Sequence, residues 1–138
     1  MAISNGRNPR LAGVEFTPVE VVAQATQLPI NSIPPLTKVV KVTGVATNAD
    51  DFIVLPSLAS CPDGHQITIL CSAASNFELR TPSGSAEEIN SEDCDGTKEY
   101  LCTDTQILYV TKINNTIGWM GNAYTAIGAV ATAVVPDA

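Results

Sequence analysis

The sequence predicts an all-β fold, a small β-sandwich or jelly-roll-like domain with an extended N-terminal arm. From residue 37 onward, short runs rich in β-branched and aromatic residues alternate with turn-forming residues. The clearest pair spans residues 106–120, where Asn114 and Asn115 separate two such runs. Because asparagine tolerates positive φ, we expect these two residues to form the tip of a β-hairpin. Proline recurs in the first 36 residues, which favours an extended arm there.

The length and composition suit one domain. The chain has 138 residues, of which 45% are hydrophobic and 15% charged, so it can bury a core. We expect residues 1–36 to form the arm and residues 37–138 to form the β-sandwich domain. The first ten residues contain no apolar run of signal-peptide length, and the longest uncharged stretch, residues 123–136, is shorter than a membrane span of about 20 residues. The sequence therefore predicts a soluble, unexported protein.

The charge is unevenly distributed along the chain. The net charge is −7, and residues 50–104 hold eleven acidic residues against only Arg80 and Lys98. Residues 1–49 carry a net charge of +2. Nucleic acids and anionic membranes are bound through clustered lysine and arginine. An acidic body therefore argues against both kinds of partner.

The arm contains many apolar residues for a segment without a long periodic pattern. Residues 14–25 are compatible with a strand or a short helix, and we favour an extended conformation. Residues 28–36 contain Pro29, Pro34 and Pro35, so they are expected to be extended and poorly suited to the centre of a sheet. So many apolar side chains do not suit a freely solvated tail. The arm is expected either to fold back onto its own domain or to dock on a neighbouring subunit or a larger assembly.

The body is predicted to consist of short strands separated by turns. The first lies near a sheet edge, because Lys38 and Lys41 discourage unwanted pairing. The last, residues 125–135, is alanine-rich and could be a helix, but its β-branched residues and Gly128 favour a strand. The expected strands are residues 37–45, 52–55, 66–71, 77–80, 98–102, the two arms of the hairpin, and 125–135.

No residue constellation in the sequence points to catalysis, a metal or a cofactor. His65 is the single histidine and has no nucleophile motif around it, so we expect a partly solvated turn residue. The acidic residues 87–96 do not fit a calcium-binding loop at either end and are expected to form a solvated turn. The spacing of the four cysteines does not suit zinc. The four cysteines are Cys61, Cys71, Cys94 and Cys102. We expect either buried thiols or one or two disulfides, and four cysteines can be paired in three ways, among which the sequence does not choose.

Two aromatic residues of the hairpin are candidates for contacts with other subunits. A lone tryptophan in a β-sheet is usually a core or interface anchor, whereas an exposed one can stack on a sugar ring. The first arm of the hairpin is apolar on both faces, so both faces require cover. We therefore expect Tyr109 and Trp119 to contribute to a subunit interface.

The order of segments resembles a small β-domain of tailed-phage virion proteins. The resemblance covers about residues 50–124. It is carried by FIVLP at 52–56, CPDGHQITI at 61–69, the Pro-Ser-Gly turn at 82–84, Glu88-Ile89-Asn90, Tyr100-Leu101, residues 107–110 and Gly118-Trp119. The chain departs from it where the family usually has a glycine-rich turn, at residues 90–95, and in its high cysteine content. The resemblance implies a trimeric β-domain with a structural or attachment role and no catalysis.

Among virion roles, the sequence favours a capsid decoration (cement) protein on the outer surface of a phage head. A fibre requires repeated shaft segments, which this chain lacks, whereas a compact body with an apolar arm suits a protein that bridges capsid joints. The expected partners are the major capsid protein and two further copies of the chain, on virions assembled in the host cytoplasm. The alternative is a phage fibre or a receptor- or carbohydrate-binding module. The expected capsid-binding residues are Val14, Phe16, Val19, Val21, Leu28, Ile30, Ile33 and Leu36.

Overall fold

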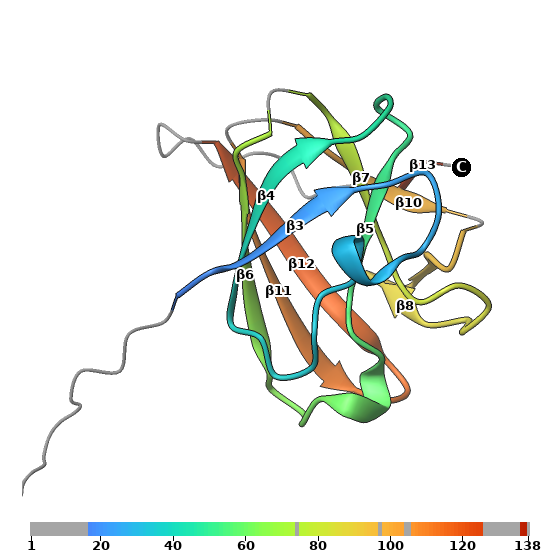
Figure 1. Ribbon diagram of the computed structural model, residues 1–138. Helices are drawn as coiled ribbons and strands as arrows, with labels where there is room; N and C mark the ends of the chain where they lie inside the picture. The colour runs from blue at the N-terminus through green and yellow to red at the C-terminus, as the bar shows by residue number, and fades with distance from the viewer. Residues whose placement is uncertain (1–16, 74, 97, 104–105, 126–135, 138) are drawn as a thin grey trace, which may run out of the picture.

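The protein folds into two packed β-sheets, which confirms the predicted all-β class (Figure 1). The computed structural model describes residues 17–73, 75–96, 98–103, 106–125 and 136–137. One sheet has seven strands, in the order β3 (Val19–Ala23), β4 (Val39–Val45), β6 (Gln66–Cys71), β11 (Gln106–Asn114), β12 (Gly118–Thr125), β8 (Glu88–Ile89) and β9 (Glu92–Asp93). The other has four strands, in the order β13 (Pro136–Asp137), β10 (Glu99–Cys102), β7 (Phe77–Arg80) and β5 (Phe52–Val54). Two 3₁₀ turns, η1 (Pro29–Asn31) and η2 (Leu58–Ser60), join strands.

The core lies between the inner faces of the two sheets. Along β6 and β11 every second side chain is buried, as a sheet with one covered face requires. In Figure 1, β3 and β4 cross in front of β11 and β12, so the seven-stranded sheet curls around the core. The largest fully buried side chains come from both sheets and from Leu55, directly after β5: Trp119, Tyr100, Phe77, Ile53, Leu55, Ile67, Ile69, Leu79, Ile89 and Leu108.

The described part of the expected arm belongs to the body. β3 pairs in parallel with β4, from Val19 opposite Val40 to Ala23 opposite Val45. Beyond β3, Gln24 pairs with Phe52, and Ser32 forms a bridge with Val54. Residues 24–32 therefore connect β3, at the edge of one sheet, to β5, at the edge of the other. The expected boundary at residue 36 is therefore wrong for residues 17–36, which fold back onto their own domain, and residues 1–16 lie outside the described part.

The β11–β12 hairpin is present, but its turn differs from the expected one. Asn114 lies opposite Gly118, and the register shifts between Lys112 and Asn114, which marks a β-bulge. The Asn114 side chain accepts hydrogen bonds from the amides of Thr116 (2.8 Å) and Ile117 (2.7 Å). Positive φ is adopted by Gly118, at +84°, and not by either asparagine. The asparagine thus stabilises the turn through its side chain, and glycine provides the left-handed residue.

Most of the other expected elements are confirmed. The strands at Gln66–Cys71 and Phe77–Arg80 have the predicted bounds, and β4, β5 and β10 fall within the predicted segments. Residues 87–96 form the β8–β9 hairpin and bury Ile89 and Cys94, so this segment is more than a solvated turn. Residues 126–135 of the expected last strand lie outside the described residues.

A glycine-to-alanine substitution tests the close approach of the β11–β12 turn to β8. A Cβ at Gly118 would meet the backbone carbonyl of Glu88, and the residue also has positive φ. We expect Gly118→Ala to lower the free energy of unfolding by roughly 3 kcal/mol, since strain at positive φ and a backbone clash add. Gly84→Ala is the matched control, because Gly84 has φ +71° but open space around it. It should lose only about 1 kcal/mol in urea unfolding, and equal losses in the two variants would contradict the close approach.

Candidate functional site

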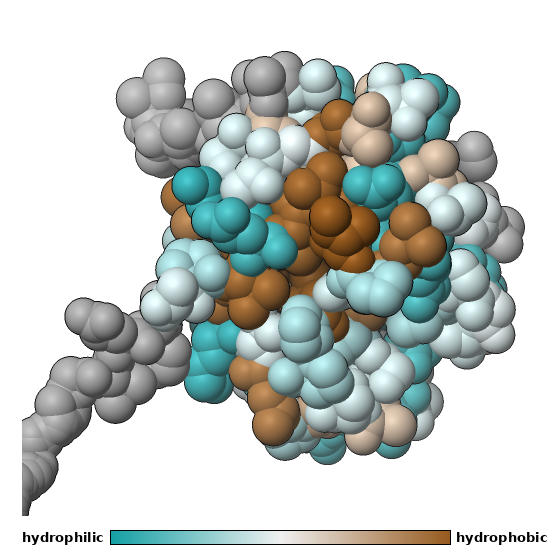
Figure 2. Space-filling model, viewed as in Figure 1, coloured by the Kyte–Doolittle hydropathy of each residue, from teal (hydrophilic) through white to brown (hydrophobic). Residues whose placement is uncertain are grey.

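The candidate site is an apolar surface on the loop of residues 28–36, which connects β3 to β4 through η1. Three large hydrophobic side chains of this loop face solvent: Leu28 is 44% exposed, Ile30 51% and Leu36 61%. Figure 2 shows hydrophobic side chains gathered near the centre of the face that carries β3 and η1. Val19 and Val22 of β3, which precedes this loop in the sequence, are half-buried and also expose some apolar surface. The loop therefore presents apolar surface that its own core does not use.

The loop is held rigidly by the side chain of Asn31, which is fully buried. Its carbonyl oxygen accepts a hydrogen bond from the Leu28 amide at 2.7 Å. Its Nδ2 donates to the carbonyl of Thr26 at 3.1 Å and to that of Phe52 in β5 at 2.7 Å. A buried amide with all these partners fixes the backbone around it, because leaving one of them unpaired is unfavourable. The Ile33 amide also donates to the Val54 carbonyl, at 2.9 Å.

The far end of the loop is fixed by His65. The Thr37 amide and hydroxyl both donate to the Pro34 carbonyl, at 3.3 and 2.7 Å, which closes a turn over Pro35 and Leu36. His65 Nε2–H donates to the Thr37 carbonyl at 2.8 Å. His65 is 5% exposed, so the expectation of a partly solvated turn residue is wrong. The histidine is a structural anchor for the loop, and its burial follows from its place at the start of β6.

Leu36 occupies an unfavourable backbone conformation. Its φ is +66°, at the turn position where glycine or asparagine is usual. For a leucine this conformation costs about 1 kcal/mol, and a side chain that is mostly exposed recovers little of it by burial. Neither the backbone conformation nor the exposed side chain of Leu36 therefore favours folding, which makes the residue a candidate for contact with another molecule.

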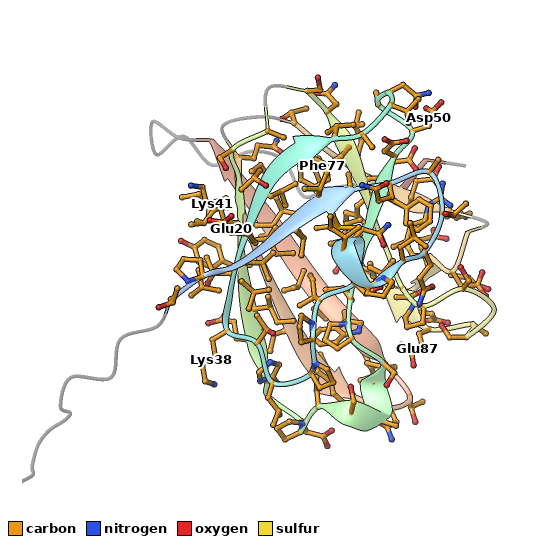
Figure 3. The ribbon with its side chains drawn as sticks, in the orientation of Figure 1. Glu20, Lys38, Lys41, Asp50, Phe77 and Glu87 are labelled. Carbon is orange, nitrogen blue, oxygen red and sulfur yellow. The ribbon has the colours of Figure 1, made fainter. Side chains whose placement is uncertain are left out.

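The charges around the loop differ from those of the rest of the body. Lys38, just before β4, and Lys41, in β4, are both exposed, and Glu20 lies beside Lys41 in the β3–β4 register. Figure 3 shows these three residues on the left of the molecule, with Asp50 and Glu87 on the opposite side. Lys38 therefore places a positive charge close to Leu36, which would attract an acidic group on a contacting surface.

The structure divides the expected capsid-binding residues into three groups. Leu28, Ile30 and Leu36 are exposed and remain available for binding. Val21 and Ile33, each 2% exposed, are core residues, and Val19 is partly buried against the core. The prediction that these three bind a capsid is corrected here, since β3 pairs with β4 and Ile33 packs beside β5. Val14 and Phe16 lie outside the described residues.

The two expected interface residues of the hairpin behave differently. Tyr109 is 38% exposed on the outer face of β11. Trp119 is 0% exposed and belongs to the core, opposite Ile89 in the β12–β8 pair. Trp119 is therefore neither an interface residue nor a platform for a sugar ring. The hairpin register separates the two positions, because Trp119 lies opposite the buried Lys112, whereas Tyr109 lies on the outer face opposite Asn122.

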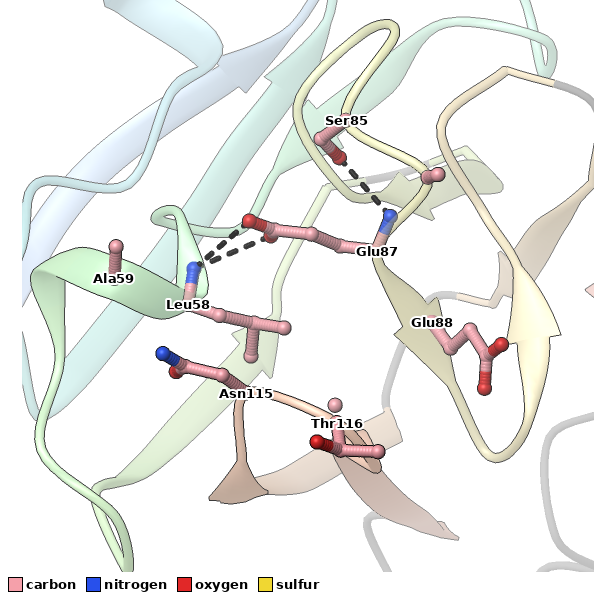
Figure 4. A pocket seen from close by; sticks show the side chains of 9 residues that line it. Leu58, Ala59, Ser85, Glu87, Glu88, Asn115 and Thr116 are labelled. Atoms are coloured by element: carbon pink, nitrogen blue, oxygen red, sulfur yellow. Dashed lines mark hydrogen bonds between the residues drawn. The ribbon is translucent and has the colours of Figure 1, made fainter.

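A polar pocket of about 280 Å³ lies between η2, the β7–β8 connection and the β11–β12 turn (Figure 4). Glu87 points across it toward η2, where its carboxylate accepts hydrogen bonds from the Leu58 amide at 3.1 and 3.2 Å. Glu88 points to the other side of the strand. Because the two carboxylates diverge, they do not form the pair that general acid–base catalysis requires. Glu87 fastens η2 to β8, and no substrate position follows from it.

Lys112 of β11 holds η2 and the residues that follow it. Its Nζ donates to the carbonyls of Leu58 and Cys61, both at 2.7 Å, and lies 3.3 Å from the Asp63 carboxylate. Lys112 is 3% exposed, so its charge is satisfied almost wholly inside the protein. This lysine fixes the loop between η2 and β6 and leaves little capacity for a ligand.

The cysteines are buried thiols in this structure, one of the two states left open by the sequence. Burial raises the pKa of Cys94 to about 11, and burial likewise raises the pKa of Cys102. A thiol that stays protonated is a poor nucleophile and a poor metal ligand. Within the described residues, no group of three or more His, Cys, Asp or Glu side chains is placed to hold a metal ion.

Comparisons with known proteins do not assign the chain to a family. No family model matches the sequence, and no curated protein matches it significantly. Among the residues that the structure describes, none forms a helix with the length and apolar character to cross a membrane.

Replacing Leu36 by asparagine tests the strain in the loop. We expect Leu36→Asn to raise the free energy of unfolding by up to about 1 kcal/mol, because asparagine tolerates positive φ. The matched control is Leu101→Asn on β10, since Leu101 is 39% exposed and has no positive φ. The control should be neutral or destabilising in thermal and urea unfolding, because asparagine is unfavourable in strands. A loss of stability at position 36 equal to that at position 101 would show that Leu36 is not strained.

The pH dependence of stability tests the burial of Glu87. Burial raises the pKa of Glu87 despite the opposing effects of the Leu58 amide and Lys112, and burial also raises the pKa of Glu78. A carboxyl with a raised folded pKa contributes stability below its unfolded pKa and loses it as pH rises through the folded value. The free energy of unfolding should therefore fall as the pH rises above 4.5, the ordinary glutamate pKa, and through the raised pKa of the folded state. Glu87→Gln should flatten this fall in urea titrations.

Glu88→Gln is the control for the pH experiment. It removes one negative charge from the neighbouring residue without touching the bond to Leu58. If the two variants change the pH profile equally, overall charge and not the burial of Glu87 governs the effect.

Proposed function

We propose that this protein is a structural virion protein, a capsid decoration (cement) protein that binds the outer surface of a phage head as a trimer and stabilises it. The observation that carries the proposal is the rigid apolar loop, in which Leu28, Ile30 and Leu36 face solvent on a hydrogen-bonded frame. The order of segments that resembles phage virion β-domains supports the same role. The proposed partner is the major capsid protein, met on the head exterior.

The fixed loop suits a binder that stays on a large surface. Ordering a flexible arm on binding opposes association, whereas this loop is already ordered by Asn31 and Thr37. Each of the three exposed side chains would contribute about 1 kcal/mol when its remaining surface is buried. One loop therefore binds weakly. Three loops of a trimer that engage the same shell raise the affinity by avidity.

The competing role is a phage fibre or a receptor- or carbohydrate-binding module. Its main support was an exposed Trp119, and that residue is buried in the core. No other observation in the described residues favours sugar binding, so the decoration role is the stronger proposal.

A single charged substitution on the loop tests the proposal. We expect Ile30→Glu to reduce binding to purified phage heads lacking this protein at least about tenfold, because a carboxylate would be desolvated in an apolar contact. Ile117→Glu is the matched control, since Ile117 is 43% exposed but lies in the β11–β12 turn. Binding is measured by co-sedimentation, with circular dichroism to establish folding.

Comparison of Ile30→Glu with Ile117→Glu shows whether the 28–36 loop is the surface that contacts the head. Loss of binding in Ile30→Glu with normal binding in Ile117→Glu supports the loop as the contact surface. Undiminished binding of a folded Ile30→Glu variant, or absence of binding by the unmodified protein, would refute the proposed role of the loop. Deletion of residues 1–36 is not a clean test, because it removes β3 and part of the core.

A further inference from the structure

The outer face of β6, β11 and β12 is a second exposed surface with an unusual composition. Its residues follow from the register, in which Ile107 lies opposite Leu70 and Tyr109 lies opposite Thr68 and Asn122. Tyr109, Ile113 and Met120 are 38–44% exposed. We call this surface the hairpin face. Its described members are Gln66, Thr68, Leu70, Ile107, Tyr109, Thr111, Ile113, Met120 and Asn122.

None of these nine residues is charged, although the chain carries a net charge of −7. Two copies of an acidic protein repel each other, and like charges brought together at a contact cost several kcal/mol. A contact between copies is therefore most favourable where each copy presents no charge. The nine residues of the hairpin face meet this condition, with Lys41 of β4 beside Leu70 at its border. The face also carries tyrosine and methionine, two residue types enriched at the centres of interfaces.

The edges of the seven-stranded sheet are less suitable for self-association. One edge strand, β9, consists of Glu92 and Asp93, and charge on an edge discourages pairing with another chain. The other edge strand, β3, carries Glu20 and leads directly to Gln24, which pairs with Phe52 in the other sheet. Of the surfaces of the seven-stranded sheet, its outer face is therefore better suited to self-association than either of its edge strands.

The hairpin face also leaves the 28–36 loop free. Figure 1 shows β11 and β12 behind β3, β4 and η1, with the core between them. Their outer face thus points away from the side that carries Leu28 and Ile30. One surface can contact other copies while the other contacts a different partner.

We infer that the hairpin face is the surface through which copies of this chain associate. The trimeric state rests on the proposed function, whereas the choice of surface rests on its exposed apolar residues and its lack of charge. In a closed symmetric assembly all contacts between copies are equivalent, so one substitution on the hairpin face acts at every contact that this face makes.

Charged substitutions on the hairpin face test this inference. Met120→Glu and Asn122→Glu place a carboxylate on the exposed side of β12 without removing a core residue. We expect each to raise the dissociation constant of self-association at least about tenfold, as measured by sedimentation equilibrium. The matched control is Ile30→Glu, which places the same charge on the 28–36 loop. Two variants are used so that misfolding of one does not decide the result.

The control also separates this inference from the proposed function. Self-association should be lost in Met120→Glu and retained in Ile30→Glu, whether or not either protein binds phage heads. A monomeric unmodified protein, or unchanged association of folded Met120→Glu and Asn122→Glu, would overturn the inference. So would loss of association in Ile30→Glu alone, because the loop would then be the contact between copies. Loss of head binding with unchanged self-association in Met120→Glu would assign the hairpin face to the capsid and also overturn it.

Discussion

The buried side-chain amide of Asn31 is the contact on which the rest of the architecture depends. It joins the loop after β3 to the Phe52 carbonyl of β5, so it links a segment of the seven-stranded sheet to the four-stranded sheet. Without it, the Leu28 amide and the Thr26 carbonyl would lose this partner, and the Phe52 carbonyl would keep only the Gln24 amide. The same bonds determine where the neighbouring side chains point. The closure of the sandwich and the exposure of Leu28 and Ile30 therefore have one cause.

This coupling gives the protein an ordered apolar surface where the sequence predicted an extended arm. Leu36 adopts a strained φ in a turn closed by Thr37 and His65, and its side chain stays in solvent. The positive φ of Leu36 lowers stability there. On the far side of the core, the nine residues of the hairpin face carry no charge, although the protein has a net charge of −7. Two surfaces with different chemistry thus lie on opposite sides of one small domain.

Local patterns predicted much of the fold but not the position of its N-terminal part. The bounds of β6 and β7 followed from β-branched and aromatic runs stopped by turn residues, and the β11–β12 hairpin from the Asn114 interruption. The prolines around residues 29–35 suggested an arm, because the sequence does not reveal a partner strand so distant in the chain. Parallel pairing of β3 with β4, and burial of Asn31, depend on tertiary contacts. The apolar composition of residues 28–36 led to the prediction that Leu28, Ile30 and Leu36 bind a capsid, and the structure shows that these three side chains are exposed. The hydrogen bonds that fix their positions depend on tertiary contacts and could not be predicted.

Hydrogen–deuterium exchange of the protein, alone and bound to phage heads, tests the central claim most directly. The account predicts that the amides of Asn31, Ile33 and Thr37, all hydrogen-bonded within the fold, exchange slowly in the free protein. It also predicts that residues 28–37 become more protected on the heads. Rapid exchange of these amides in the free protein, or protection on the heads that leaves residues 28–37 unchanged, would contradict it.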